Sequence, residues 1–227
     1  PPTLAEACDA AIVAEVRNTE IYDALLPTIE DAQIRSVFEN LRAASLERHL
    51  PAFQRHGSGW ATVAKADLTE AQRAQKESAI AARDAMFATL FGELSMAMAD
   101  NGAAGAIDVC STRAPEIARE TAEQRGVRIG RTSWKLRNPK NTPPVWAELL
   151  LDDRPEKIVT TADRSGRLGV IAPIKLSSAC LQCHGPRETL EAAVVEELDR
   201  RYPGDQATGF AAGDLRGWFW IEVPAPN

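Results

Sequence analysis

The feature that most limits the fold is a change of hydrophobic period near Gly126. Up to about residue 124, apolar side chains recur every three or four residues, which is typical of amphipathic helices. Beyond Gly126, short stretches rich in aliphatic, β-branched and aromatic residues alternate with turn residues. We expect strands at Val127–Arg137, Glu148–Leu151, Lys157–Thr161, Leu168–Leu176 and Arg216–Val223. Helices followed by a run of strands predict an α+β fold with an antiparallel sheet.

The helical half divides at His56-Gly57-Ser58-Gly59, which reads as a linker. Before it, residues 3–56 predict two amphipathic helices, the second kinked or ended near His49 by Pro51. We therefore predict a helical hairpin over residues 1–57 and an α+β domain over residues 67–227.

Two further helices are expected after the linker. A capping-box-like pattern from Asp67 to Glu70 predicts a helix start, and Asn101-Gly102 predicts its end. Pro115 suits the first turn of a short helix that runs to about Gln124.

Composition excludes some classes of function. The 227 residues carry a formal net charge of −6, which argues against nucleic-acid binding through phosphate neutralisation. No apolar run approaches the ~20 residues that a membrane span needs. The chain begins Pro1-Pro2, without the charged and apolar regions of a signal peptide, as expected of an exported protein that is mature or trimmed.

Cys180-Leu181-Gln182-Cys183-His184 matches C-x-x-C-H, the pattern for covalent haem attachment. Two intervening residues let both thiols reach the two vinyl groups of one porphyrin, and the adjacent histidine can bind the iron. A thioredoxin-like redox motif would need a βαβ unit, and a zinc site would need two more ligands at matching spacing. The sequence shows neither, so we predict one covalently attached haem c, held by Cys180 and Cys183, with His184 as an iron ligand. Because such haems are attached outside the energy-transducing membrane, we expect a periplasmic location.

The residues alone leave the second iron ligand open. The other residues with suitable donor atoms are His49, His56, Met86, Met96, Met98, Cys8 and Cys110. An iron with one open position is a further alternative. By default, a methionine on a long helix is core filler and a lone cysteine is a buried thiol.

Several stretches between residues 69 and 224 resemble a bacterial haem-binding domain family with a PAS-like fold, long catalogued as of unknown function. The matching segments are Ala106–Cys110 with Ala114-Pro115, Gly130–Pro139, Asn141–Pro143, Cys180–Gly185, Tyr202–Phe210 and Gly213–Gly217. The family includes cyanobacterial single-haem cytochromes with His/Cys iron ligation. This resemblance implies that Cys110 is the second iron ligand.

Arginines in the same region are candidates to bind the haem propionates, since a guanidinium pairs with a carboxylate through two hydrogen bonds. We single out Arg131 and Arg137, and after them Arg216. Trp134, Trp218 and Phe219 are candidates for the wall of the haem site or for ordinary core.

The hairpin resembles half of a ferritin-like bundle, in which glutamate and histidine side chains bind metal. Glu15 and His49 fall on apolar faces, but Leu46 breaks the Glu-x-x-His motif and the second helical pair is absent. We therefore expect packing to be the role of these helices, with homodimerisation through them as one form of it. Whether Glu15 and His49 bind metal stays open.

These features together predict a periplasmic monohaem c-type cytochrome for low-potential electron transfer or for redox or gas sensing. Its expected partners are a redox protein and a diatomic gas. A thiolate-haem enzyme of sulfur-compound oxidation, or a gas-binding or peroxidase-type protein with an open iron, is the alternative. The single attachment motif favours a role other than catalysis.

Overall fold

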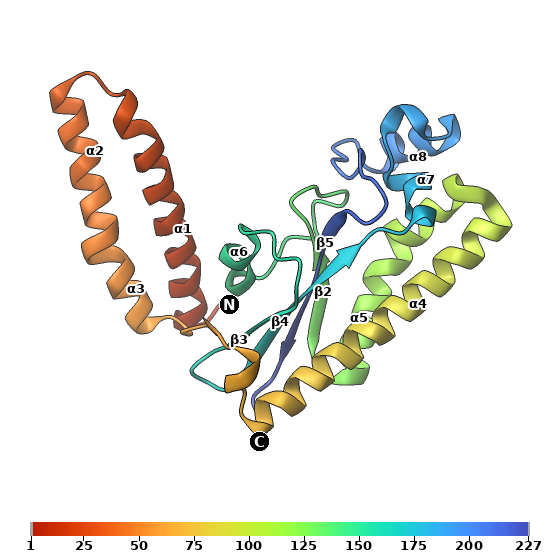
Figure 1. Cartoon of the computed structure of the whole chain (residues 1–227), viewed down its shortest axis with the longest axis horizontal. Helices are drawn as coiled ribbons and strands as arrows, with labels where there is room; N and C mark the ends of the chain where they lie inside the picture. Colours follow the sequence, from red (N-terminus) through yellow and green to blue (C-terminus); the bar gives the residue numbers. More distant parts are fainter. Residues whose placement is uncertain (1, 227) are drawn as a thin grey trace. The chain divides into compact units, whose positions relative to one another are not determined.

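The computed structural model describes residues 2–226 and divides into two compact units (Figure 1). The smaller unit contains residues 2–61, 144–153 and 162–165, and the larger unit contains the other described residues. Among the described residues, no helix is long and apolar enough to cross a membrane. Helices and a sheet are both present, so the predicted α+β class is confirmed.

The smaller unit is a helical hairpin with one extra helix. It contains α1 (Leu4–Leu25), η1 (Leu26–Thr28), α2 (Ala32–Ala44), η2 (Ser45–His49), α3 (Leu50–His56) and α6 (Val145–Leu151). Thr3 caps α1 in a complete capping box with Glu6, and the carboxylate of Asp31 caps α2. Pro51 kinks the second helix without ending it: a π-helical turn absorbs the break, and Pro51 sits in the first turn of α3.

Polar contacts and an aromatic stack close the base of the hairpin. The carboxylate of Asp9 accepts a hydrogen bond from the Ser58 amide at 2.8 Å. Trp60 stacks on Trp146 of α6, with ring centroids 5.1 Å apart. The predicted strand at Glu148–Leu151 is wrong, because these residues form most of α6. Helix α6 packs on α1 and carries Asp152 at its end, which pairs with Arg17.

Glu15 and His49 do meet within this unit. The Nδ1 atom of His49 lies 3.1 Å from a carboxylate oxygen of Glu15, while the other oxygen is buried without a hydrogen-bond partner. Among residues 2–226, no group of three or more His, Cys, Asp or Glu side chains is arranged to hold a metal ion.

The larger unit begins with long helices. Helix α4 (Glu70–Asp108) follows η3 (Lys65–Asp67) and leads through a π-helical turn, η4 (Val109–Arg113), into α5 (Ala114–Arg125). Its cap is Thr69, in a capping box with Gln72, rather than the predicted Asp67. Gly102 does take the expected left-handed conformation, with φ of 68°, but it bends α4 instead of ending it.

A five-stranded sheet packs against α4 in the order β1-β3-β4-β5-β2. Its strands are β1 (Ala61–Thr62), β2 (Arg128–Thr132), β3 (Val159–Ala162), β4 (Leu168–Lys175) and β5 (Leu215–Val223). Strand β5 pairs antiparallel with both β2 and β4, as predicted for an antiparallel sheet. Val170, Ile171 and Ile221 are fully buried at the sheet centre.

The segment between β4 and β5 is mostly helical. It contains η5 (Ser178–Cys180), α7 (Leu181–His184), η6 (Arg187–Thr189) and α8 (Ala192–Arg201). In α8, Val194 and Leu198 are fully buried against Ala103 and Ile107 of α4. Sequence periodicity had not predicted α8.

Candidate functional site

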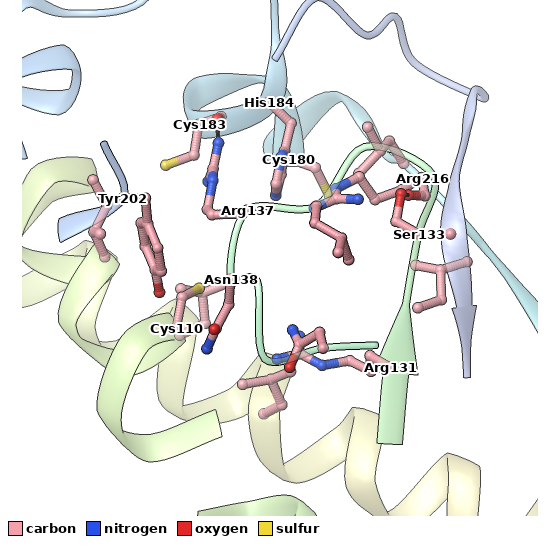
Figure 2. A pocket seen from close by; sticks show the side chains of 18 of the residues that line it. Cys110, Arg131, Ser133, Arg137, Asn138, Cys180, Cys183, His184, Tyr202 and Arg216 are labelled. Carbon is pink, nitrogen blue, oxygen red and sulfur yellow. Dashed lines mark hydrogen bonds between the residues drawn. The ribbon is translucent and has the colours of Figure 1, made fainter. Parts of the chain in front are cut away.

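A cavity lies inside the larger unit, with about 1100 Å³ of empty space counted out to its open mouth (Figure 2). One wall is apolar and comes from α4, through Leu90, Leu94 and Met98. The other walls come from η4, β2 and the loop after it, α7, and the first residues of β5.

The C-x-x-C-H residues form one wall of this cavity. Cys180 ends η5, and Cys183 and His184 lie in the single turn of α7. The carbonyl oxygens of His184 and Gly185 accept hydrogen bonds from the amides of Phe210 and Gly209, at 3.0 and 2.8 Å. A Cβ on Gly185 would come 2.7 Å from the Leu181 carbonyl oxygen, so only glycine lets the chain leave the turn here. The motif is therefore fixed to the segment just before β5.

The imidazole of His184 points into the cavity (Figure 2). Its Nδ1 atom lies 2.7 Å from the carbonyl oxygen of Ala207. A carbonyl oxygen only accepts, so Nδ1 carries the proton and Nε2 keeps its lone pair. Burial, followed by the charges of Arg137 and Arg216, lowers the pKa of His184 well below its ordinary value. The ring is thus neutral near pH 7 and oriented by its Nδ1 bond, as in histidine ligands of metals.

Cys110 reaches the same cavity from a different element, the π-helical turn η4 (Figure 2). The turn is held on both sides of this cysteine. Arg201 of α8 pairs with Asp108 at 2.7 Å and donates to the Ser111 hydroxyl at 2.6 Å. Arg113 binds carboxylates of α4 and α5, from Glu93, Glu116 and Glu120. A π turn inserted between two helices changes which side chains face inward, and here it places Cys110 at the cavity.

The other candidates for the second iron ligand differ in whether they lie at the cavity. Of these, Met98 also lines the cavity. Met86 is buried away from it, and Met96 is 60% exposed. Cys8, His49 and His56 belong to the smaller unit.

Three arginines line the cavity and differ in their partners (Figure 2). Arg137 is buried and has three polar partners: it pairs with Asp205 at 3.0 Å and donates to the carbonyl oxygens of Cys183 and Ala207. Arg216 donates to the Lys135 carbonyl oxygen at 3.0 Å and lies over the Phe210 ring.

The side chain of Arg131, partly buried on β2, forms no hydrogen bond or ion pair with any residue from 2 to 226. Burial lowers the pKa of Arg131. Burial and the neighbouring Arg137 and Arg131 charges likewise lower the pKa of Arg216 to about 10. The cavity therefore has an excess of positive charge, which favours an anionic ligand.

The two cysteines of the motif are free thiols in different surroundings. Cys180 lies at the cavity wall, with its sulfur 3.3 Å from the Ser177 hydroxyl. Cys183 packs toward the apolar cluster between α4 and α8, and burial raises its pKa to about 11.

The aromatic candidates belong to the core rather than to the cavity wall. Trp134 packs on Trp218 and Phe210, and the Trp218 indole donates to the Pro155 carbonyl oxygen at 2.8 Å. Neither tryptophan nor Phe219 lines the cavity. Tyr202, Asn138 and Ser133 do line it, although sequence patterns had not given them a role.

Comparisons with known proteins show which family and which solved structure this chain is similar to. The family model described as Tll0287-like matches residues 58–224. The crystal structure of the cyanobacterial heme-protein Tll0287 superposes with a TM-score of 0.51 at 23% sequence identity. The match covers 68% of this chain and 97% of that one, and it shows a shared fold. No curated protein sequence matches the chain.

Proposed function

This chain belongs to the Tll0287-like family, and we propose that it is a c-type haem protein with one covalently bound haem. Cys180 and Cys183 would bind it through thioethers, each formed by adding one S–H across one vinyl double bond. His184 would bind the iron through Nε2. The observation that carries the proposal is this motif at the wall of a cavity, with a neutral, oriented imidazole directed into it. The name of the related crystal structure, a heme-protein, supports it.

The residues present fit a haem in charge as well as in donor atoms. A guanidinium that is partly buried without a counter-ion is unfavourable, and Arg131 is such a group. A haem has two propionates, so a carboxylate at Arg131 would supply the missing partner. Arg216 could also bind a propionate, whereas Arg137 is already bound to Asp205 and to two carbonyl oxygens. We therefore assign Arg137 to holding the attachment turn in place, and Arg131 and Arg216 to the propionates.

We further propose Cys110 as the second iron ligand, with Met98 as the alternative donor at the cavity. A thiolate donor would favour ferric over ferrous iron, so the haem would supply a low-potential one-electron couple. We propose a role in low-potential electron transfer, or in redox or gas sensing, in the periplasm. A thiolate-haem enzyme acting on sulfur compounds, or a protein with an open iron position, is the second candidate. Rapid CO binding to the ferrous protein would indicate an open iron position, and its absence a six-coordinate haem.

Covalent attachment is tested first. The chain, expressed with a haem-ligation system, should keep its haem on a denaturing gel. A Cys180→Ala/Cys183→Ala variant should lose that haem, while Cys8→Ala, a change in the smaller unit, should keep it. Retention of covalent haem by the double variant would overturn the assignment of the two thiols.

The second ligand is tested by Cys110→Ala and Met98→Leu. Loss of a thiolate donor should change the visible spectrum and raise the midpoint potential in the cysteine variant alone. A changed spectrum with a lowered midpoint potential in Met98→Leu, with Cys110→Ala unaffected, would assign the methionine instead, because a thioether ligand raises the potential.

A further inference from the structure

The hydrogen-bond acceptor of the His184 ring is shared with a second donor. The Ala207 carbonyl oxygen lies 2.7 Å from Nδ1 of His184 and also accepts a hydrogen bond from Arg137 at 3.3 Å. A carbonyl oxygen has two lone pairs, so it can accept both bonds. The second donor carries a full positive charge, which draws electron density of the oxygen toward itself. Arg137 therefore weakens the hydrogen bond that the imidazole makes.

The carboxylate of Asp205 fixes both the guanidinium and the residue that carries the shared oxygen. One carboxylate oxygen accepts from Nε of Arg137 at 3.0 Å, and the other accepts from the Ala207 amide at 2.7 Å. The side chains of Arg137 and Asp205 are 8% and 2% exposed, so water and salt screen their charges little. Arg137, Asp205 and Ala207 thus form a closed triangle of contacts beside the imidazole.

The position of Arg137 relative to His184 is set by further contacts. Its guanidinium donates to the carbonyl oxygen of Cys183, the residue before the histidine, at 2.6 Å (Figure 2). The Leu136 carbonyl oxygen, next to Arg137 in the chain, accepts from the Gln206 amide at 3.0 Å. The segment of Arg137, the attachment turn and the segment of Ala207 are therefore tied together, and the guanidinium stays beside the shared oxygen.

We propose that Arg137 and Asp205 are positioning residues that set how strongly His184 donates to the haem iron, an inference that rests on the proposed function. A strong hydrogen bond from Nδ1 gives an imidazole part of the character of its anion, which strengthens Nε2 as a donor and stabilises ferric iron. Sharing of the Ala207 carbonyl oxygen has the opposite effect. The pair therefore keeps the midpoint potential higher than an unshared carbonyl oxygen would.

Two variants change the pair in opposite directions. Arg137→Leu combined with Asp205→Asn removes the second donor and both charges, so the net charge of the site is unchanged. The new amide oxygen at position 205 can still accept from the Ala207 amide. Asp205→Asn alone leaves the guanidinium charge uncompensated, so Arg137 should draw more strongly on the Ala207 carbonyl oxygen.

The Nδ1 proton of His184 reports the strength of its hydrogen bond without any haem. Its NMR signal in the full chain without haem should move downfield in the double variant and upfield in Asp205→Asn. Arg216→Gln is the control, because it removes another cavity cation, whose hydrogen bond goes to the Lys135 carbonyl oxygen. That variant should leave the signal in place.

Shifts of this signal in the same direction in both pair variants, or no shift in either, would overturn the proposal. If the double variant does not fold, Asp205→Asn decides alone, and a downfield or absent shift overturns the proposal.

The midpoint potential of the haem-loaded chain is the second readout. We expect it to be lower in the double variant and higher in Asp205→Asn. A lower potential in the double variant without the downfield proton shift would show that the pair acts on the iron directly, and would reject a role through His184. Failure of the wild type to bind haem covalently would instead overturn the proposed function, while the proton signal still shows whether the pair controls the hydrogen bond.

Discussion

Arg131 and Arg137 are six residues apart, line the same cavity and carry the same charge, yet they have different environments. Arg137 neutralises Asp205, whose side chain is only 2% exposed, and so Arg137→Gln leaves a buried carboxylate unpaired. We expect this variant to lose about 3–5 kcal/mol of unfolding free energy. Arg131→Gln removes an unpaired cation and should leave the stability of the apoprotein unchanged or higher. Urea unfolding of the two apoproteins gives the comparison, and equal losses would show that Arg131 has a structural partner after all.

Arg131→Gln should instead change the redox centre. A positive charge near the iron favours the ferrous form, so its removal should lower the midpoint potential of the haem-loaded protein. Arg131→Lys keeps the charge and should restore most of the potential, which a potentiometric titration would detect. An unchanged potential in Arg131→Gln would remove this residue from the haem site.

Gly217 fixes how closely two strands approach beside the cavity. Its φ is 155°, and a Cβ there would lie 2.2 Å from the Thr132 carbonyl oxygen of β2. We predict that Gly217→Ala costs about 1–3 kcal/mol, because β2 must move away from β5. Gly204→Ala is the control, since its Cβ would meet no atom within 4 Å. Comparable denaturation midpoints for the two variants would show that the strands adapt without cost.

At the level of elements, the turn that carries Cys110 depends on α8. Arg201 of α8 holds Asp108 and Ser111, which flank Cys110, so Arg201→Ala should loosen η4. We expect Cys110 of the apoprotein to react several-fold faster with a thiol reagent in this variant. Arg201→Lys keeps a donor and should react at an intermediate rate. An unaltered rate in Arg201→Ala would mean that the Arg113 contacts suffice to hold the turn.

Acid should weaken α8 through Glu197. Hydrogen bonds from Arg200 and then Arg201 lower the pKa of Glu197 to about 2, from an ordinary value near 4.5. Because the folded-state pKa is the lower one, the stabilisation is complete above about pH 4.5 and is lost as the pH falls toward 2. Urea midpoints at pH 6 and pH 3 should therefore fall more for the wild type than for Glu197→Gln. Equal falls would assign the acid sensitivity to other carboxylates.

Sequence periodicity predicted secondary structure best where an apolar run was compatible with only one kind of element. Strands β3, β4 and β5 were predicted within a few residues, because their apolar runs are bounded by turn residues. Glu148–Leu151 was wrong, because Leu149, Leu150 and Leu151 suit a strand or a helix. These leucines are helical because Pro143-Pro144 precede the first turn of α6 and because α6 packs against α1.

The cavity could be predicted only in part from sequence. The C-x-x-C-H motif is local, so spacing identified Cys180, Cys183 and His184. The partner of Arg137 is Asp205, which lies on a distant segment, and no local pattern distinguishes this arginine from Arg131. The π turn at Cys110 has no sequence signature, and only the family resemblance pointed to that residue.

On the scale of the whole molecule, two compact units predict two unfolding transitions rather than one. A ligand stabilises the part that binds it, so haem loading should raise the transition of the larger unit and leave the other in place. Asp9→Ala removes the buried carboxylate that accepts the Ser58 amide hydrogen bond at the base of the hairpin, so it should lower only the remaining transition. Differential scanning calorimetry of apo and haem-loaded protein makes the comparison. A single transition that responds to both changes would show that the units unfold cooperatively.

The smaller unit is not continuous in sequence, since residues 144–153 and 162–165 join the hairpin from within the second half of the chain. During synthesis, α1, α2 and α3 leave the ribosome long before α6. The stack of Trp60 on Trp146 therefore forms only after α6 has been made. The hairpin therefore differs from an appended module that evolution could transfer intact to another protein. Any gene fusion or deletion cut after residue 57 would separate Asp152 from Arg17 and Arg164 from the Gly57 carbonyl oxygen. Because residues 144–153 and 162–165 complete the smaller unit, the hairpin and the sheet domain are expected to be inherited together.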